Sequence, residues 1–224
     1  MKHLLRSLKK ALPLPQGMNP QRIRSGVAAG VVMEMSFGNK FQRFLGVEER
    51  EIHADFRRLA KQSKALLDIG ASDGIYPLSA INVNPDIQCL GVDPCDEMRQ
   101  QIEKNKTLNA GRLPVANIQW LQTMVGTEHT TLDEIASKLP RPLLIKMDID
   151  GGEVDALTSG LKTLQEKGVT LIVEIHSDEL EADCIKLLTN LGYTCTVRRN
   201  AWWRALVPEQ RPIPTNHWFV AERK

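Results

Sequence analysis

The feature that most constrains this chain is an alternation of short apolar runs with helical segments, which begins at Lys64. Such an alternation is typical of a parallel sheet whose faces are covered by helices. Strands are predicted at 65–70, 88–93, 117–121, 143–148 and 170–176. The helices that follow them are predicted at 75–83, 96–109, 132–139, 153–167 and 178–191.

The end of the chain breaks this alternation. Residues 193–198 and 217–222 both have the pattern of strands, and the Pro-rich connection between them holds no helical pattern. Two consecutive strands without a crossover helix pair antiparallel or lie apart. We therefore predict an α/β fold with a mostly parallel, seven-stranded sheet, helices on both faces and an antiparallel final strand. This is the Rossmann-like arrangement of class I methyltransferases rather than that of nicotinamide-binding folds.

The segment 1–63 has a different texture and is interpreted as a helical extension that covers the substrate, while 64–224 form the cofactor-binding domain. A short basic amphipathic helix is predicted at 1–10, as a packing or oligomer contact compatible with a homodimer. A second, charged helix is predicted at 47–63, with Ile52, Phe56 and Leu59 on one face.

Composition narrows the environment and the partners. The formal net charge of +2 is too small to argue for nucleic acid, and no nucleic-acid partner is expected. No apolar run approaches the roughly 20 residues of a membrane helix, so no stable membrane insertion is expected. The four cysteines form no C-x-x-C pair, which favours reduced thiols and a cytoplasmic protein.

The loop after the first predicted strand, Asp68-Ile69-Gly70-Ala71-Ser72-Asp73-Gly74, is the strongest cofactor signal. Ligands bind beyond the carboxyl ends of strands in open α/β sheets, and the two glycines permit a tight turn and close approach. The pattern D-x-G-x-x-x-G is neither the dinucleotide fingerprint nor a P-loop. Asp68 and Asp73 would repel a diphosphate, whereas they suit a cofactor that carries an ammonium and a sulfonium.

A second carboxylate, Asp93, ends the next predicted strand and can accept both hydroxyls of a ribose. NAD enzymes share this feature, and taken singly Asp93 could cap a helix and Asp68 a loop. Together with the strand order and the glycines, these residues predict S-adenosyl-L-methionine as the cofactor. The predicted cofactor-binding set is Asp68, Gly70, Ala71, Ser72, Gly74, Asp93 and Pro94.

Four motifs, in order, resemble the FkbM family of methyltransferases: Asp68–Gly74, Thr131–Asp133, Lys146–Glu153 and Val173–His176. The family patterns are D-[IV]-G-A-x-x-G, T-L-D, K-[IM]-D-[IV]-E-G-x-E and V-E-x-H. Asp150 stands where the family usually has Glu. The resemblance covers roughly residues 45–200. It implies S-adenosylmethionine-dependent O-methylation, with a hydroxyl of a sugar, glycan or natural-product small molecule as acceptor.

The ends of the fourth and fifth predicted strands would face the transferred methyl group. Methyl transfer depends largely on positioning, and a hydroxyl acceptor must also lose its proton to a base or be activated by a metal. The catalytic candidates are Asp148, Asp150, Glu153, Glu174 and His176. Asp148 is favoured for orienting or deprotonating the acceptor, His176 titrates in the useful range unless it is a simple loop residue, and Lys146 is interpreted as a structural partner of these carboxylates.

Several alternatives remain open from sequence. Asp148, Asp150, Glu174 and His176 could form a Mg²⁺ site, but their spacing is not a recognised ligand set, so no metal is expected. Trp202-Trp203 with Arg204 could stack on an acceptor, or could cover the sheet edge or a dimer contact. A non-catalytic methyltransferase-fold binding protein is the second hypothesis, and an NAD-dependent oxidoreductase is the third.

Overall fold

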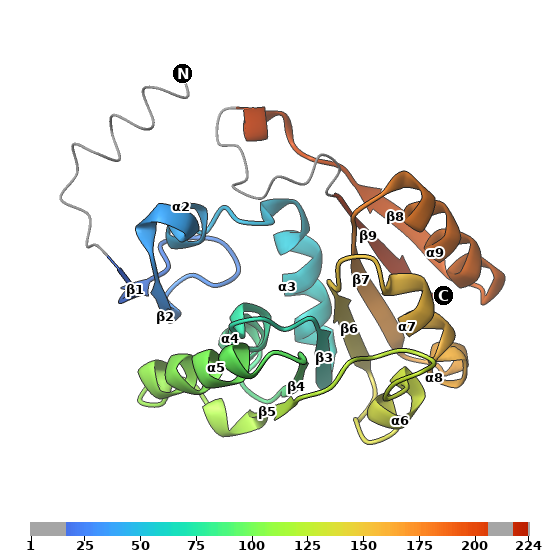
Figure 1. Cartoon of the computed structure of the whole chain (residues 1–224), viewed down its shortest axis with the longest axis horizontal. Helices are drawn as coiled ribbons and strands as arrows, with labels where there is room; N and C mark the ends of the chain where they lie inside the picture. Colours follow the sequence, from blue (N-terminus) through green and yellow to red (C-terminus); the bar gives the residue numbers. More distant parts are fainter. Residues whose placement is uncertain (1–16, 206–216, 224) are drawn as a thin grey trace.

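The structure is a computed structural model that describes residues 17–205 and 217–223 (Figure 1). The predicted helix at 1–10 and most of the Pro-rich connection lie outside the described residues, and so does the side chain of Trp203. Among the described residues, no helix combines the length and the apolar character that crossing a membrane requires.

A seven-stranded sheet with the order β5-β4-β3-β6-β7-β9-β8 forms the centre of the molecule. Five neighbouring strands are parallel, while β9 lies between β7 and β8 and is antiparallel to both. The predicted mostly parallel sheet with an antiparallel final strand is therefore confirmed. The strands are β3 (Ala65–Ile69), β4 (Gln88–Val92), β5 (Ile118–Leu121), β6 (Leu143–Met147), β7 (Val169–Ile175), β8 (Thr194–Arg198) and β9 (His217–Glu222).

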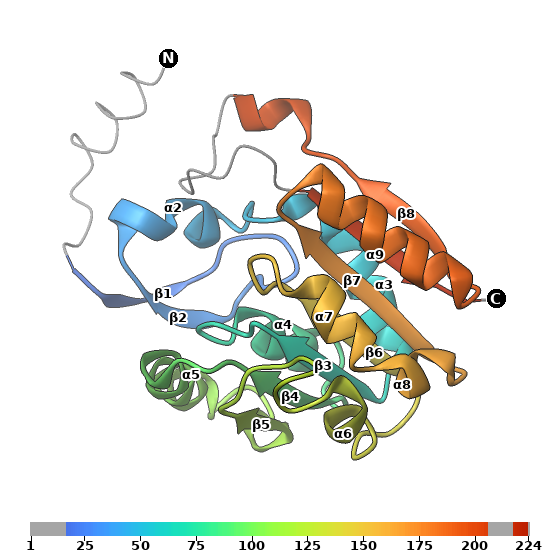
Figure 2. The same cartoon turned by 45° about the vertical axis from the view of Figure 1, so that its right-hand side comes forward.

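Two hydrophobic cores cover the two faces of this sheet. One contains residues of α3, α4 and α5, and the other contains residues of α6, α7, α8 and α9. Figure 2 shows α7 and α9 on the near face and α3 behind the sheet. Every residue of β3 and β6 is buried, as expected for central parallel strands that are covered on both sides. The helices are α3 (His53–Gln62), α4 (Ile75–Val83), α5 (Asp96–Asn109), α6 (Leu132–Ala136), α7 (Glu153–Thr158), α8 (Leu161–Gln165) and α9 (Asp178–Asn190).

The single helix predicted at 153–167 is wrong, because the chain breaks there into α7 and α8. Gly160 lies between the two helices and packs tightly against α6. A Cβ atom at Gly160 would lie 2.3 Å from Leu132 Cδ2, so only glycine permits this approach. The break lets α6 and α8 pack together over the same face of the sheet.

The segment before the sheet is only partly helical. It begins with an antiparallel pair, β1 (Asn19–Arg22) and β2 (Val32–Met35), followed by α2 (Phe37–Leu45), the 3₁₀ turn η1 (Arg50–Ile52) and α3. This corrects the expected helical extension over its described part. Asn109 of α5 extends the hairpin by accepting a hydrogen bond from Val32 N at 3.0 Å and donating one to Val32 O at 2.6 Å.

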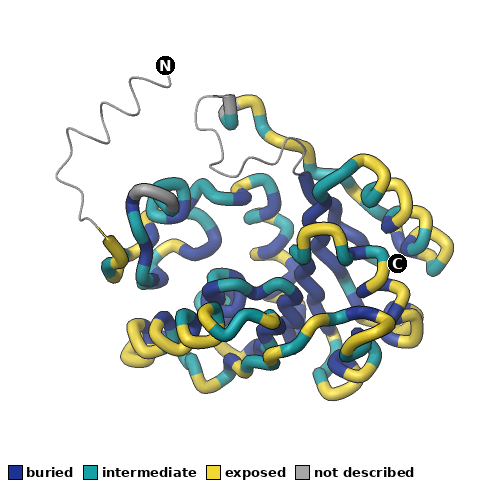
Figure 3. Tube along the Cα trace, viewed as in Figure 1, coloured by how far each residue is buried: buried dark blue, intermediate teal, exposed yellow. Residues whose placement is uncertain are grey.

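The same segment packs into the core of the α4 face rather than standing apart from it. Val31, Met33 and Met35 lie in one buried cluster with Ile52 and Phe56. Helix α4 is consequently covered by the sheet on one side and by this segment on the other, which explains why it is apolar nearly all round. Figure 3 shows the buried strands at the centre and the exposed loop that follows β6.

Candidate active site

A pocket of about 270 Å³ opens at the carboxyl ends of β3, β4 and β6. This is the edge of the sheet at which the sequence places the ligand. The pocket is lined by residues from both predicted sets and from the loop after β5, which carried no sequence signal: Gly70, Asp93, Pro94, Thr123, Met124, Val125, Asp148, Ile149, Asp150 and Gly152, together with Ile69 and Val92.

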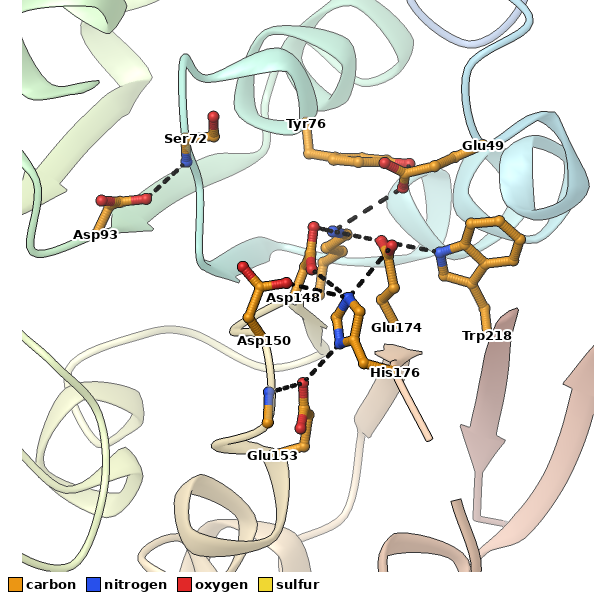
Figure 4. A network of polar contacts seen from close by, with 12 residues as sticks. Glu49, Ser72, Tyr76, Asp93, Asp148, Asp150, Glu153, Glu174, His176 and Trp218 are labelled. Atoms are coloured by element: carbon orange, nitrogen blue, oxygen red, sulfur yellow. Dashed lines mark hydrogen bonds and ion pairs between the residues drawn. The ribbon is translucent and has the colours of Figure 1, made fainter. Parts of the chain in front are cut away.

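The turn after β3 requires glycine at Gly70. Its φ is +80°, and a Cβ atom there would lie 1.8 Å from the carbonyl oxygen of Asp148. Asp93 is held beneath the same turn, because its Oδ2 accepts a hydrogen bond from Ser72 N at 3.0 Å and its Oδ1 accepts one from Cys95 N at 2.9 Å (Figure 4). The turn and Asp93 thus form one rigid wall of the pocket.

Three other residues of the loop shape the turn and do not line the pocket. Gly74 has a φ of +83°, and a Cβ atom there would lie 2.4 Å from Ile102 Cδ1. Ala71 is buried. The carboxylate of Asp73 forms an ion pair with Arg43 of α2, so its charge does not face the pocket as the sequence argument assumed.

Asp68 is a buried carboxylate whose surroundings do not satisfy it. Its side chain is 1% exposed, and neither oxygen accepts a hydrogen bond from the described residues. Burial raises the pKa of Asp68 to about 7, with Lys146 opposing the shift and Asp148 adding to it. A carboxyl group of this kind is poised to ionise when a cation arrives beside it.

Lys146 is the buried cation of the site. Its Nζ lies 3.4 Å from Asp148 Oδ2, 3.9 Å from Glu174 Oε2 and 4.0 Å from Glu49 Oε2, and 4.8 Å from the centre of the Tyr76 ring. Burial alone would lower the pKa of Lys146, but the surrounding carboxylates outweigh it and raise the pKa. The ammonium therefore stays charged and balances part of the acidic cluster.

His176 lies among carboxylates on the other side of the cluster. Its Nε2 is 3.3 Å from Asp150 Oδ1, 3.6 Å from Asp148 Oδ1 and 3.7 Å from Glu174 Oε1. Its Nδ1 is 3.3 Å from Glu153 Oε1, which also accepts a hydrogen bond from Gly151 N at 3.1 Å. The contact with Glu153 raises the pKa of His176, whereas its burial opposes that rise.

All five predicted catalytic side chains thus meet at one place, with Glu153 fully buried behind His176. Three further side chains complete the cluster without having been predicted. Trp218 Nε1 donates a hydrogen bond to Glu174 Oε2 at 3.1 Å, and the Tyr76 hydroxyl donates one to Glu49. Trp218 lies opposite Glu174 in the β7–β9 pairing. This pairing could have pointed to Trp218, but it can be predicted only when the order of the strands in the sheet is known.

Of the segment Trp202-Trp203-Arg204, the structure describes the side chains of Trp202 and Arg204. Trp202 is 81% exposed, on a 3₁₀ turn η3 (Trp202–Ala205). Arg204 forms an ion pair with Glu51 at 2.6 Å and lies 5.0 Å from the centre of the Trp218 ring. Arg204 therefore fastens this turn to the segment before the sheet.

Residues 41–195 match the family model described as the methyltransferase FkbM domain. The chain belongs to the FkbM methyltransferase family. The match contains Asp68, Asp93 and the whole 146–176 region, and it begins in α2. No curated protein matches the chain.

Solved structures show the same class I fold. The FkbM methyltransferase from Methylobacillus flagellatus KT has 18% identity and a TM-score of 0.58, over 72% of this chain and 44% of that one. Precorrin-6y C5,15-methyltransferase from Geobacter metallireducens GS-15 has 13% identity and a TM-score of 0.55, over 78% and 88%. The METTL16 methyltransferase domain has 16% identity and a TM-score of 0.53, over 76% and 65%. This FkbM chain spans less than half of the length of the Methylobacillus protein.

Proposed function

We propose that this protein transfers a methyl group from S-adenosyl-L-methionine to a hydroxyl of a small molecule or glycan. The observation that carries the proposal is the pocket at the ends of β3, β4 and β6, which is lined by Asp93 at the end of β4 and by Asp148 and Asp150 after β6. Membership of the FkbM family supports methyl transfer as the reaction.

The residues around the pocket fit this cofactor. Asp93 keeps spare acceptor capacity on both oxygens for the two ribose hydroxyls, since each accepts one backbone hydrogen bond. Asp68 does not itself line the pocket, and we assign to this unsatisfied buried carboxylate the electrostatic attraction of the cofactor's ammonium group. Gly70 itself carries no side chain, which lets the turn approach the Asp148 carbonyl closely. When bound, the cofactor supplies a methyl carbon that its sulfonium has already activated.

The acidic residues on one side of the pocket bind and orient the acceptor. Asp148 and Asp150 line the pocket, and we assign to Asp148 the orientation of the acceptor hydroxyl and the acceptance of its proton. His176 contacts both Asp148 and Glu174 and completes the acceptor side with them. Glu153 is a positioning residue because it contacts His176 and is fully buried.

The test is transfer of an isotopically labelled methyl group to a panel of hydroxyl-bearing sugars and natural products. The wild-type protein is expected to label an oxygen of at least one acceptor. Asp148→Asn is expected to lose most of the rate, whereas the exposed control Asp86→Asn keeps it. Full labelling by Asp148→Asn would refute the assigned role, and cofactor binding with no transfer to any acceptor would indicate a non-catalytic protein.

A further inference from the structure

Two carboxylates at the ends of neighbouring strands each lie between Lys146 and His176, with one oxygen near each of them. Asp148 has Oδ2 at 3.4 Å from Lys146 Nζ and Oδ1 at 3.6 Å from His176 Nε2. Glu174 repeats the pattern, with Oε2 at 3.9 Å from Lys146 Nζ and Oε1 at 3.7 Å from His176 Nε2. Lys146 therefore neutralises one side of the pair. The other side is a separate group of donors that also includes Asp150 Oδ1 (Figure 4).

The spacing of this second group is close to that of metal ligands. Two ligand atoms about 2.1 Å from one ion, at angles of about 90–120°, lie about 3.0–3.6 Å apart. The distances from His176 Nε2 to the three oxygens are 3.3, 3.6 and 3.7 Å. One ligand atom each from Asp148, Glu174 and His176 lies within 4.8 Å of the others. Carboxylate oxygens with one imidazole suit Mg²⁺ or Mn²⁺.

The histidine is supported as a ligating histidine would be. Glu153 Oε1 lies 3.3 Å from Nδ1 and is itself held by Gly151 N, so the ring is oriented with Nε2 toward the three oxygens. Asp150 has a φ of +50°, a left-handed conformation that a non-glycine residue rarely adopts. This backbone turn places the Asp150 carboxylate beside His176.

The charge around the cluster also calls for a cation. Asp148, Glu174 and Glu49 each place a carboxylate oxygen within 4.0 Å of Lys146 Nζ. Lys146 is the one buried lysine among the described residues. Buried carboxylates that outnumber their partners are costly unless a cation joins them.

We propose that Asp148, Glu174 and His176, whose ligand atoms lie within 4.8 Å of one another, bind a divalent cation of the Mg²⁺ or Mn²⁺ class beside the pocket. Asp150, with Oδ1 3.3 Å from His176 Nε2, joins them as a fourth ligand from the exposed loop. From the sequence we expect no metal, because the spacing of these residues is not a recognised ligand set. The acceptor hydroxyl would be a further ligand of the cation, and this last part rests on the proposed function. The proton of that hydroxyl goes to Asp148, as proposed above.

The test is a titration of the metal-free full-length protein with Mn²⁺, in which the concentration of free Mn²⁺ is measured by electron paramagnetic resonance. One Mn²⁺ per chain is expected. Asp150→Asn and His176→Gln are expected to weaken binding at least tenfold, and Glu153→Gln by about 10–100-fold through loss of the support behind the histidine. The control Glu179→Gln, an exposed acid on α9, is expected to bind as the wild type does. The Asp150 side chain is 77% exposed, so its variant keeps the test valid if a buried variant does not fold.

Weak binding that is equal in the wild type and in Asp150→Asn would overturn the proposal, because surface acids alone would then explain it. Binding of S-adenosylhomocysteine, measured by calorimetry in EDTA, separates this proposal from the proposed function. If S-adenosylhomocysteine binds but no Mn²⁺ site is found, only the cation proposal is refuted. If a Mn²⁺ site is found but S-adenosylhomocysteine does not bind, the cation proposal is supported and the proposed cofactor is refuted.

Discussion

Replacing Asp68 by Asn removes a buried carboxyl group while keeping its shape, and the effect depends on pH. The pKa of Asp68 is raised from 3.8 to about 7, so the folded protein holds a proton there that the unfolded chain releases. Stability is therefore lost as pH rises from about 4 through about 7, because the unfolded state binds fewer protons in that range. A rise of about three pKa units corresponds to about 4 kcal/mol in total.

In Asp68→Asn this loss of stability with rising pH is absent, because asparagine does not ionise. Relative to the wild type without cofactor, we expect Asp68→Asn to gain about 3 kcal/mol in free energy of unfolding between pH 5 and pH 8. Urea denaturation at the two pH values measures this difference, with Asp86→Asn as the exposed control. A relative stability that is the same at both pH values would refute the reasoning, since Asp68 would then titrate in the ordinary carboxyl range. We also expect the variant to bind S-adenosylmethionine more weakly.

Three other substitutions test the packing of the site. Lys146→Met leaves Asp148, Glu174 and Glu49 without their buried cation, so the free energy of unfolding in chemical denaturation is expected to fall by about 3–5 kcal/mol. The exposed control Lys167→Met is expected to change it little. An equally small loss in both variants would contradict the role of Lys146 in balancing these charges. Gly70→Ala is expected to lower the free energy of unfolding by more than about 2 kcal/mol and to abolish cofactor binding in calorimetry. The reason is that φ at this position is +80° and the added Cβ would clash with the Asp148 carbonyl. Gly111→Ala is the control, because a Cβ there meets open space. Trp218→Phe keeps an aromatic ring but removes the indole N–H that donates to Glu174 and leaves part of the buried volume empty. A loss of at least about 1–3 kcal/mol is therefore expected in thermal denaturation, and an unchanged Tm would show that Glu174 does not need this hydrogen bond.

Local sequence patterns predicted much of this fold because they coincide with the tertiary contacts. The limits of α4, α5 and β9 agree with the predicted ranges. The break at Gly160 could not be predicted, because it depends on the side chain of Leu132 from another helix. The β1–β2 hairpin was missed because its edge is completed by asparagines of α5, far along the chain.

The site shows the same division between local and distant information. Strand ends in a parallel sheet converge, so the acidic residues after β6 and β7 could be grouped from sequence alone. Glu49 could not, because it precedes η1 and reaches Lys146 only through the packing of the N-terminal segment on α4. The charge of Asp73 was assigned to the pocket, yet Arg43, 30 residues earlier, neutralises it.

Calorimetric titration of the wild-type protein with S-adenosylmethionine, S-adenosylhomocysteine and NAD⁺ tests the central claim most directly. The account predicts one site per chain for the first two ligands, weaker in Asp68→Asn, and no binding of NAD⁺, because the pocket offers carboxylates where a diphosphate needs donors. Binding of NAD⁺ without binding of S-adenosylhomocysteine would contradict it.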